Sequence, residues 1–397
     1  MHIIESGNVA AAMGVKLSKA QVIAAYPITP QTPLTEKLSE FIESGEMNAE
    51  YIPVESEHSA LSVCIAAATT GARAFTATSA NGLLYMHEQI HWAAGARLPL
   101  VMCVVNRGVG APWTIWNDHQ DSISQRDTGW IQLYVNDHQQ IIDTVIKAFS
   151  LAEEVSIPVM VCYDGYLLSH TYMPFEVPDA DKVDAFLPLF KPSYALYSGE
   201  PANLNTVTLP DARIDVHGKL AHGYMELRYL LQENLRQSVD VVSKVETKFM
   251  DMFGRGGDPF IESYMCEDAD FIAVSMGSLS YQLRDVADLL RDENIKVGVA
   301  GIRLYRPFPD KVIVEHFQNA AGVVVFEKAI SYGFHGPLYS DIKSALYNCK
   351  NRPFIHNYTL GLGGREIKTK ELFNALKDSC TNGSSQVEKR GWIGLKI

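Results

Sequence analysis

The chain has 397 residues, which is enough for two or three globular domains and excludes a disulfide-stapled miniprotein. Hydrophobic residues make up 47% of it and charged residues 20%, a composition typical of a globular protein rather than a disordered one. The net charge of -12 repels phosphate backbones and anionic lipids, so we expect neither a nucleic acid nor a membrane as a partner.

The six cysteines lie far apart in the sequence and form no C-x-x-C motif. This spacing provides neither a zinc knuckle nor the ligand set of an iron–sulfur cluster, so no metal site is expected in this chain. The first residues contain no basic segment followed by an apolar core, and no window reaches about 18 uninterrupted apolar residues. With reduced cysteines and no targeting or spanning signal, we expect a cytoplasmic protein.

The first part of the chain alternates between short apolar segments and helical stretches. The helical stretches include 60–68 and 83–94, and this β-α pattern predicts an α/β domain at 1–175 with a mainly parallel sheet. The strands are predicted at 22–26, 51–54, 74–78, 98–105, 130–135 and 157–163.

A connector at 176–261 is predicted to follow, with dense prolines up to residue 210 and one long helix at 222–253. The β-α pattern then resumes and predicts a second, smaller α/β domain at 262–375, with a C-terminal tail at 376–397. Its strands are predicted at 271–276, 297–304 and 322–326.

Ligands of parallel sheets bind beyond the carboxyl ends of the strands, and two early strand ends carry polar residues. Three prolines stiffen the loop at 26–33, which holds the Thr29 hydroxyl; this loop is either an anion-binding rim or a turn that opens the next helix. The segment at 53–60 places Glu55 and Glu57 at a helix start, where they either cap the helix or bond a ligand nitrogen.

A third strand end leads into the long loop at 106–121. Arg107 directly follows an apolar strand and precedes glycines, an arrangement that suits bidentate capture of a carboxylate. The alternative is an ordinary surface ion pair.

Five motifs in order along the first domain resemble those of one family. They are Tyr-Pro-Ile-Thr-Pro at 26–30, Val-Glu-Ser-Glu-His-Ser-Ala at 54–60, the helix from Met-His-Glu at 86–88 to Trp-Ala-Ala-Gly at 92–95, Trp-Asn-Asp at 116–118, and the segment at 124–130. The chain thereby resembles the alpha subunit of multi-subunit 2-oxoacid:ferredoxin oxidoreductases such as the pyruvate enzyme. Arg-Pro-Phe-Pro at 306–309 and Val-Val-Phe-Glu-Lys at 324–328 resemble the C-terminal domain of transketolase-like enzymes.

The resemblance implies two α/β domains of the thiamine-enzyme kind, one pyrimidine-type and one like the C-terminal domain of transketolase, with helices on both faces of the sheets. It implies a thiamine diphosphate enzyme that cleaves a 2-oxoacid, passes electrons through iron–sulfur clusters to ferredoxin and transfers the acyl group to coenzyme A. By position in the family motif, Glu57 is the glutamate that bonds N1′ of the aminopyrimidine. Glu55 is the alternative if the register is shifted.

For the substrate, the resemblance implies that Thr29 and Arg107 hold the 2-oxoacid carboxylate and that Asn117 or Asp118 lines the pocket. All 2-oxoacids share the unit that this pair would hold, so substrate choice depends on pocket volume. We predict pyruvate, and keep branched-chain and aryl 2-oxoacids (2-oxoisovalerate and phenylglyoxylate) as alternatives.

The chain lacks the Gly-Asp-Gly motif with which this superfamily binds magnesium diphosphate, because its one Gly-Asp pair, at 257–258, continues as Pro-Phe. We therefore expect a beta subunit with the diphosphate and Mg²⁺ half of the site. Gamma and ferredoxin-like delta subunits would complete the complex, with [4Fe-4S] clusters outside this chain and ferredoxin as the electron acceptor.

Two other classes of protein are alternatives. An NAD-dependent dehydrogenase needs Gly-x-Gly-x-x-Gly after its first strand, where this chain has the proline-rich loop at 26–33. The Gly-Leu-Gly-Gly-Arg segment at 361–365 is interpreted as a turn or interface loop. A non-catalytic scaffold subunit is the second alternative, against which Thr29, Glu57 and Arg107 argue.

Overall fold

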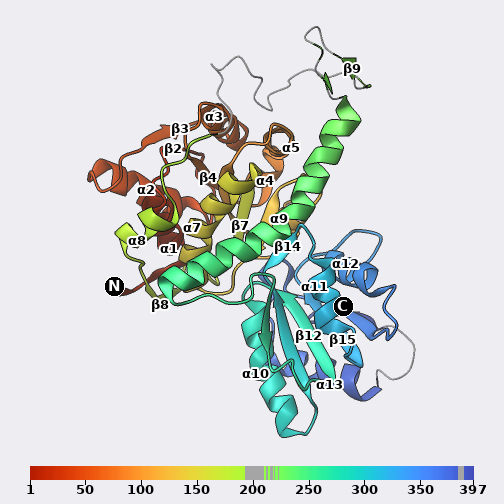
Figure 1. The fold of residues 1–397 in the computed structure, drawn as a ribbon. Helices are drawn as coiled ribbons and strands as arrows, with labels where there is room; N and C mark the ends of the chain where they lie inside the picture. The colour runs from red at the N-terminus through yellow and green to blue at the C-terminus, as the bar shows by residue number, and fades with distance from the viewer. Residues whose placement is uncertain (193–209, 212, 215–217, 219, 222, 383–388) are drawn as a thin grey trace.

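The computed structural model describes residues 1–192, 210–211, 213–214, 218, 220–221, 223–382 and 389–397. These residues form two α/β units built around mainly parallel sheets, which confirms the predicted fold class (Figure 1). The long helix α9 (Tyr224–Phe253) packs on helices of the first unit and lies within the helix predicted at 222–253. Much of the proline-rich part of the predicted connector, at 193–209, lies outside the described residues.

The first sheet has seven strands in the order β14-β6-β7-β5-β4-β2-β3. All are parallel except β14 (Leu304–Arg306), which runs antiparallel to β6. Strands β5 and β7 are buried along their whole length, as expected for central strands covered on both faces. The six predicted strands correspond to β2 (Val22–Ala25), β3 (Glu50–Pro53), β4 (Ala74–Thr78), β5 (Leu100–Asn106), β6 (Ile131–Tyr134) and β7 (Val159–Asp164).

Helices connect these strands, and α1 and α7 pack against each other. Helix α7 begins after Asp137, whose carboxylate accepts a hydrogen bond from the Gln140 N–H at 2.7 Å. The helices of this unit are α1 (Gly7–Leu17), α2 (Thr32–Glu43), α3 (Glu57–Thr69), α4 (Ala80–Tyr85), α5 (His87–Gly95), α6 (Gln120–Ile123), α7 (His138–Val155) and α8 (Ala180–Phe186). A separate antiparallel pair joins β1 (His2–Ser6) to β8 (Tyr172–Glu176).

Among the described residues, the second sheet has six strands in the order β11-β13-β12-β15-β16-β17, and only β11 of these is antiparallel to its neighbour. Its strands are β11 (Ile261–Tyr264), β12 (Phe271–Met276), β13 (Val297–Ile302), β15 (Gly322–Glu327), β16 (Phe354–Thr359) and β17 (Arg390–Trp392). Its helices are α10 (Leu279–Asp292), α11 (Asp310–Phe317), α12 (Pro337–Leu346), the 3₁₀ turn η1 (Leu362–Gly364) and α13 (Thr369–Asn382). A short pair, β9 (Arg213–Ile214) and β10 (Leu220–Ala221), lies outside both sheets.

Two segments differ from the sequence prediction in their connections. The segment predicted as one strand at 297–304 is divided, since β13 stays in the second sheet while β14 joins the edge of the first. The residues predicted as a tail at 376–397 include the end of α13 and strand β17, which pairs with β16. Both connections depend on partners distant in the sequence. None of the described helices is long and apolar enough to cross a membrane.

Candidate active site

Glu57 is a buried carboxylic acid at the start of helix α3. Ser56 caps this helix, and its hydroxyl accepts a hydrogen bond from the Ser59 N–H at 3.3 Å. Glu57 follows the cap and is only 8% exposed. Burial raises its pKa, while its own backbone N–H acts in the opposite direction. The raised pKa means that this carboxyl keeps its proton to a higher pH than an exposed glutamate does.

Gly82 of α4 leaves the space into which the Glu57 carboxyl fits. A Cβ atom at Gly82 would lie 2.5 Å from Glu57 Oε1 and 2.6 Å from Thr78 Oγ1, so a larger residue would displace both groups. Thr78 ends strand β4, and its buried hydroxyl has no hydrogen-bond partner among the described residues. Buried polar groups usually have a hydrogen-bond partner, so this hydroxyl has the capacity to bond a further group.

Glu55, the alternative carboxylate, lies exposed on the surface and accepts a hydrogen bond from the Ser59 hydroxyl. That bond is the main reason why the pKa of Glu55 is lowered. The structure therefore separates the two candidates, since only Glu57 is buried beside Thr78 and Gly82.

Arg107 lies at the end of β5 and contacts the loop that contains Thr29. Its Nε donates to the Thr114 carbonyl oxygen at 2.7 Å, and its Nη1 donates to the Thr29 carbonyl oxygen at 2.8 Å. Arg107 is 7% exposed, and burial lowers its pKa. The structure thus brings these two predicted residues together, but the contact uses the Thr29 backbone, whereas the Thr29 residue itself is exposed.

Asp121 links the loops that follow β4 and β5, and sequence reasoning did not identify it. Its Oδ2 accepts from the backbone N–H of Ala80 at 2.9 Å and of Arg107 at 3.0 Å, and its Oδ1 accepts from Asn106 Nδ2 at 2.8 Å. The carboxyl is fully buried, and burial raises its pKa to about 6. Asp121 therefore connects the start of α4, which contains Gly82, with the backbone of Arg107.

Asn117 and Asp118 each form a hydrogen bond with a residue of the second domain. Asn117 Nδ2 donates to Asp164 Oδ1 at 2.7 Å, and its Oδ1 accepts from Lys328 Nζ at 3.1 Å. Asp118 Oδ2 accepts from the Gly363 N–H at 2.9 Å, and burial raises its pKa. Both side chains are nearly inaccessible, so this part of the loop that follows Arg107 lies at the domain boundary.

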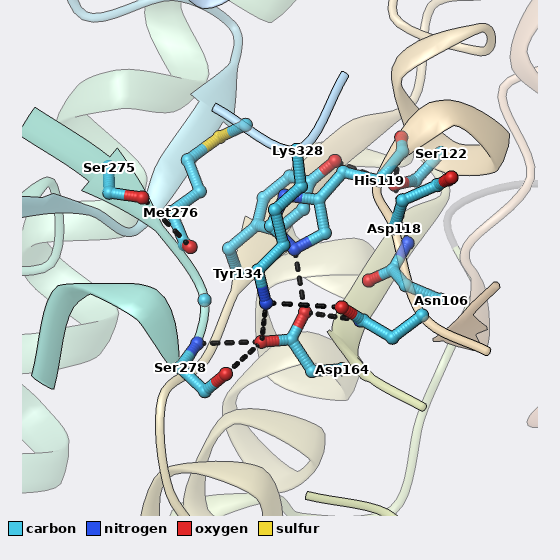
Figure 2. Close-up of polar contacts among 12 residues, drawn as sticks. Asn106, Asp118, His119, Ser122, Tyr134, Asp164, Ser275, Met276, Ser278 and Lys328 are labelled. Carbon is cyan, nitrogen blue, oxygen red and sulfur yellow. Dashed lines mark hydrogen bonds and ion pairs between the residues drawn. The ribbon is translucent and has the colours of Figure 1, made fainter. Parts of the chain in front are cut away.

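Asp164 is the centre of this boundary (Figure 2). Its Oδ1 lies 2.7 Å from His119 Nε2, and its Oδ2 accepts from the Ser278 N–H at 2.8 Å and from Lys328 Nζ at 3.2 Å. Burial by itself would raise the pKa of Asp164, but Lys328 and His119 outweigh it and hold the pKa well below its usual value. Through Ser278, the N-cap residue of α10, the Asp164 carboxylate contacts the N-terminus of that helix, where the helix dipole favours a negative charge.

The described residues include no group of three or more His, Cys, Asp or Glu side chains arranged to hold a metal ion. They do provide a buried carboxyl with a raised pKa, a glycine that makes room for it, and a buried arginine with two of its guanidinium nitrogens bonded to carbonyl oxygens. These groups fit the aminopyrimidine and substrate portions of a thiamine diphosphate site.

The fold and this constellation define the class of two-domain α/β chains found in thiamine diphosphate enzymes. A family model described as pyruvate flavodoxin/ferredoxin oxidoreductase, thiamine diphosphate-binding, matches residues 13–234. A second model, pyruvate:ferredoxin oxidoreductase core domain II, matches residues 269–372. The chain belongs to the family of 2-oxoacid:ferredoxin oxidoreductase alpha subunits, which confirms the resemblance seen in the sequence.

Relatives with two different substrates in their names are similar to this chain along nearly its whole length. Ketoisovalerate oxidoreductase subunit VorA of Pyrococcus furiosus is 45% identical, covering 99% of this chain and 98% of the relative. Pyruvate synthase subunit PorA of Methanocaldococcus jannaschii is 43% identical, covering 98% and 97%. The 2-oxoglutarate:ferredoxin oxidoreductase of Magnetococcus marinus shares the fold, with a TM-score of 0.71 and 19% identity over 96% of this chain and 65% of that one.

Proposed function

We propose that this chain is the catalytic alpha subunit of a cytoplasmic thiamine diphosphate-dependent 2-oxoacid:ferredoxin oxidoreductase, and that Glu57 bonds N1′ of the aminopyrimidine. The observation that carries the proposal is the buried Glu57 carboxyl beside Gly82. Its raised pKa favours the protonated form, which can donate a hydrogen bond to a ring nitrogen. A scaffold subunit would gain nothing from such a group, because a buried ionisable side chain costs stability.

Thiamine diphosphate, when bound, supplies the nucleophilic carbon that attacks the 2-oxo carbonyl group. Arg107 would hold the substrate carboxylate, because Nε and Nη1 each bind a carbonyl oxygen and Nη2 has no partner among the described residues. These two bonds fix the guanidinium before substrate arrives, which reduces the entropy lost on binding. The exposed Thr29 would offer its hydroxyl to the same carboxylate.

The proposed complex includes a beta subunit that carries the diphosphate and Mg²⁺ half of the site. Exposed aromatic side chains on loops of both domains support a partner surface: Trp113 is 73%, Tyr332 85% and Phe334 68% exposed. Gamma and ferredoxin-like delta subunits would carry the [4Fe-4S] clusters, ferredoxin would accept the electrons, and coenzyme A would accept the acyl group. The relatives' names, which call each of them a subunit, agree with such an assembly.

Pyruvate is the first candidate substrate, and 2-oxoisovalerate is the second. The observation that favours the second is the similar identity of this chain to a ketoisovalerate enzyme subunit and to a pyruvate synthase subunit. The test is kcat/KM of the purified complex for pyruvate, 2-oxoisovalerate and phenylglyoxylate, with coenzyme A and a viologen acceptor. Preference for pyruvate would support the first candidate, and preference for another acid would replace it.

The same assay tests whether the site is shared between chains. We expect viologen reduction by the complex and none by this chain alone, since its sequence has neither the Gly-Asp-Gly motif for the diphosphate nor the cysteine spacing for a cluster. Turnover by the isolated chain would contradict the proposal of a shared site.

A further inference from the structure

A glycine-rich turn of the second domain contacts the loop that follows Arg107. This turn comprises η1 and the preceding Gly361. The Gly363 N–H donates to Asp118 Oδ2 at 2.9 Å, and the Gly364 N–H donates to the Asn117 carbonyl oxygen at 2.7 Å. Two neighbouring loop residues are therefore bound by two neighbouring residues of the turn.

A short series of hydrogen bonds leads from this contact to the guanidinium group. The Gly108 N–H donates to the Trp116 carbonyl oxygen at 2.9 Å, and the Trp116 N–H donates to Thr114 Oγ1 at 3.2 Å. The Thr114 hydroxyl also lies 3.5 Å from the Gly363 carbonyl oxygen, and the Thr114 carbonyl oxygen accepts from Arg107 Nε at 2.7 Å. Thr114 thus touches both the turn and the arginine.

The approach of turn and loop is so close that side chains would prevent it. Gly364 has a φ of +76°, and a Cβ atom there would lie 2.3 Å from Trp116 Cβ. On the loop side, a Cβ atom at Gly108 would lie 2.6 Å from Thr114 Cγ2 and 3.4 Å from Gly363 Cα. Glycine on both sides permits this contact between two backbones.

The far end of the loop is also attached to the second domain. The His119 N–H donates to the Lys328 carbonyl oxygen at 2.9 Å, and the Ile330 N–H donates to Gln120 Oε1 at 3.0 Å. The loop is therefore held by the second domain on both sides of Asp118, while its first residue, Arg107, faces the first domain.

We propose that the turn at 361–364 is a positioning element that fixes the Arg107 guanidinium for the substrate carboxylate. This inference rests on the proposed function, in which Arg107 binds the 2-oxoacid. It gives the second domain a part in substrate binding, through Thr114 and Trp116, although the turn does not itself touch the guanidinium.

The first test is Gly364→Ala in the purified complex. Because a misplacement of about 1 Å can cost about a hundredfold, we expect KM for pyruvate and 2-oxoisovalerate to rise about tenfold or more. Thiamine diphosphate affinity and deuterium exchange at thiazolium C2 should stay unchanged, since they depend on Glu57. Gly45→Ala is the matched control, because Gly45 has a φ of +78° and no atom near its Cβ position.

A second variant, Asp118→Ala, tests the same contact in case Gly364→Ala disturbs folding. Asp118→Ala removes the acceptor of the Gly363 N–H and should also raise KM, whereas Asp118→Asn keeps an oxygen at this position and should restore much of the affinity. Loss of C2 exchange together with the change in KM would show a merely structural role and overturn the inference.

Arg107→Ala distinguishes failure of this inference from failure of the proposed function. If Arg107→Ala raises KM while Gly364→Ala and Asp118→Ala do not, the positioning role is wrong and the carboxylate site stands. If Arg107→Ala leaves KM unchanged, the proposed carboxylate site is wrong.

Discussion

Lys328 and Asp164 form a buried ion pair across the domain boundary, with Lys328 Nζ 3.2 Å from Asp164 Oδ2 and side-chain exposures of 2% and 0%. Asp164 ends strand β7 of the first sheet, whereas Lys328 follows strand β15 of the second. Both charges are buried only because the domains pack together, and in that buried state each compensates the other. The pair therefore favours one arrangement of the two domains.

Lys328→Met should lower the free energy of unfolding by about 3–5 kcal/mol, because it leaves the Asp164 carboxylate buried without its cation. Chemical denaturation of the chain measures this change. Lys37→Met is the control, since it breaks an exposed pair with Glu40 and should cost less than about 1 kcal/mol. The double variant Lys328→Met with Asp164→Asn should recover part of the lost free energy of unfolding. If Lys328→Met is as stable as the unmodified chain, the ion pair does not stabilise this arrangement of the domains.

The strands and their polar ends could be predicted because both are local features of the sequence. Apolar runs mark buried parallel strands. Arg107 directly follows such a run, and Glu57 begins the helix after another. The pairing of Asp164 with Lys328 could not be predicted, since it depends on how two separate domains pack. The same holds for Asp121, whose position among backbone N–H groups follows from loop geometry rather than from a sequence pattern.

Glu57→Gln should lower kcat of the complex by about 10²–10⁴-fold, because it keeps the shape of the side chain but removes its proton-accepting carboxylate. Deuterium exchange at thiazolium C2 should slow in parallel. Glu55→Gln is a matched control two residues away, on the surface and bonded only to Ser59 among the described residues, and should have little effect. A large effect of Glu55→Gln with normal exchange in Glu57→Gln would reverse the assignment.

Arg107→Ala should lower kcat/KM for the 2-oxoacid by at least about tenfold, since a charged hydrogen bond contributes about 1.5–3 kcal/mol. Thr29→Ala should have a smaller effect, because the Thr29 carbonyl that accepts from Arg107 remains in place. Steady-state kinetics and a thiamine diphosphate titration of both variants provide the test. A loss of cofactor affinity with an unchanged KM for the 2-oxoacid would assign Arg107 to the cofactor or to the subunit interface instead.

Gly82→Ala should lower activity by about tenfold or more, because the added methyl group would displace the Glu57 carboxyl from its position. Overpacking of this kind also destabilises a protein, typically by about 1–3 kcal/mol. Gly95→Ala is a suitable control, since a Cβ atom at Gly95 would meet nothing closer than 3.5 Å. Full activity of Gly82→Ala, measured by viologen reduction, would show that the position of Glu57 does not depend on Gly82.

Glu57 should also make the stability of the chain depend on pH. Burial raises its folded-state pKa above the ordinary value of 4.5, so between these two pKa values the folded chain binds more protons than the unfolded one. Stability must then fall as pH rises through this window. Glu57→Gln removes this titration. The free energy of unfolding of the variant, relative to that of the unmodified chain, should therefore increase as pH rises from 4.5 to the folded-state pKa of Glu57. Above that pKa the difference should stay constant.

Denaturant unfolding of both chains from pH 4 to pH 9 measures this difference. Glu55→Gln should show no such pH dependence above about pH 4.5, because the pKa of Glu55 is lowered in the folded chain and its titration window therefore lies below the ordinary value of 4.5. Stability curves for Glu57→Gln and the unmodified chain that stay parallel across the whole range would mean that Glu57 is as well solvated folded as unfolded. That result would remove the argument from burial on which its role as the proton-exchanging carboxyl depends.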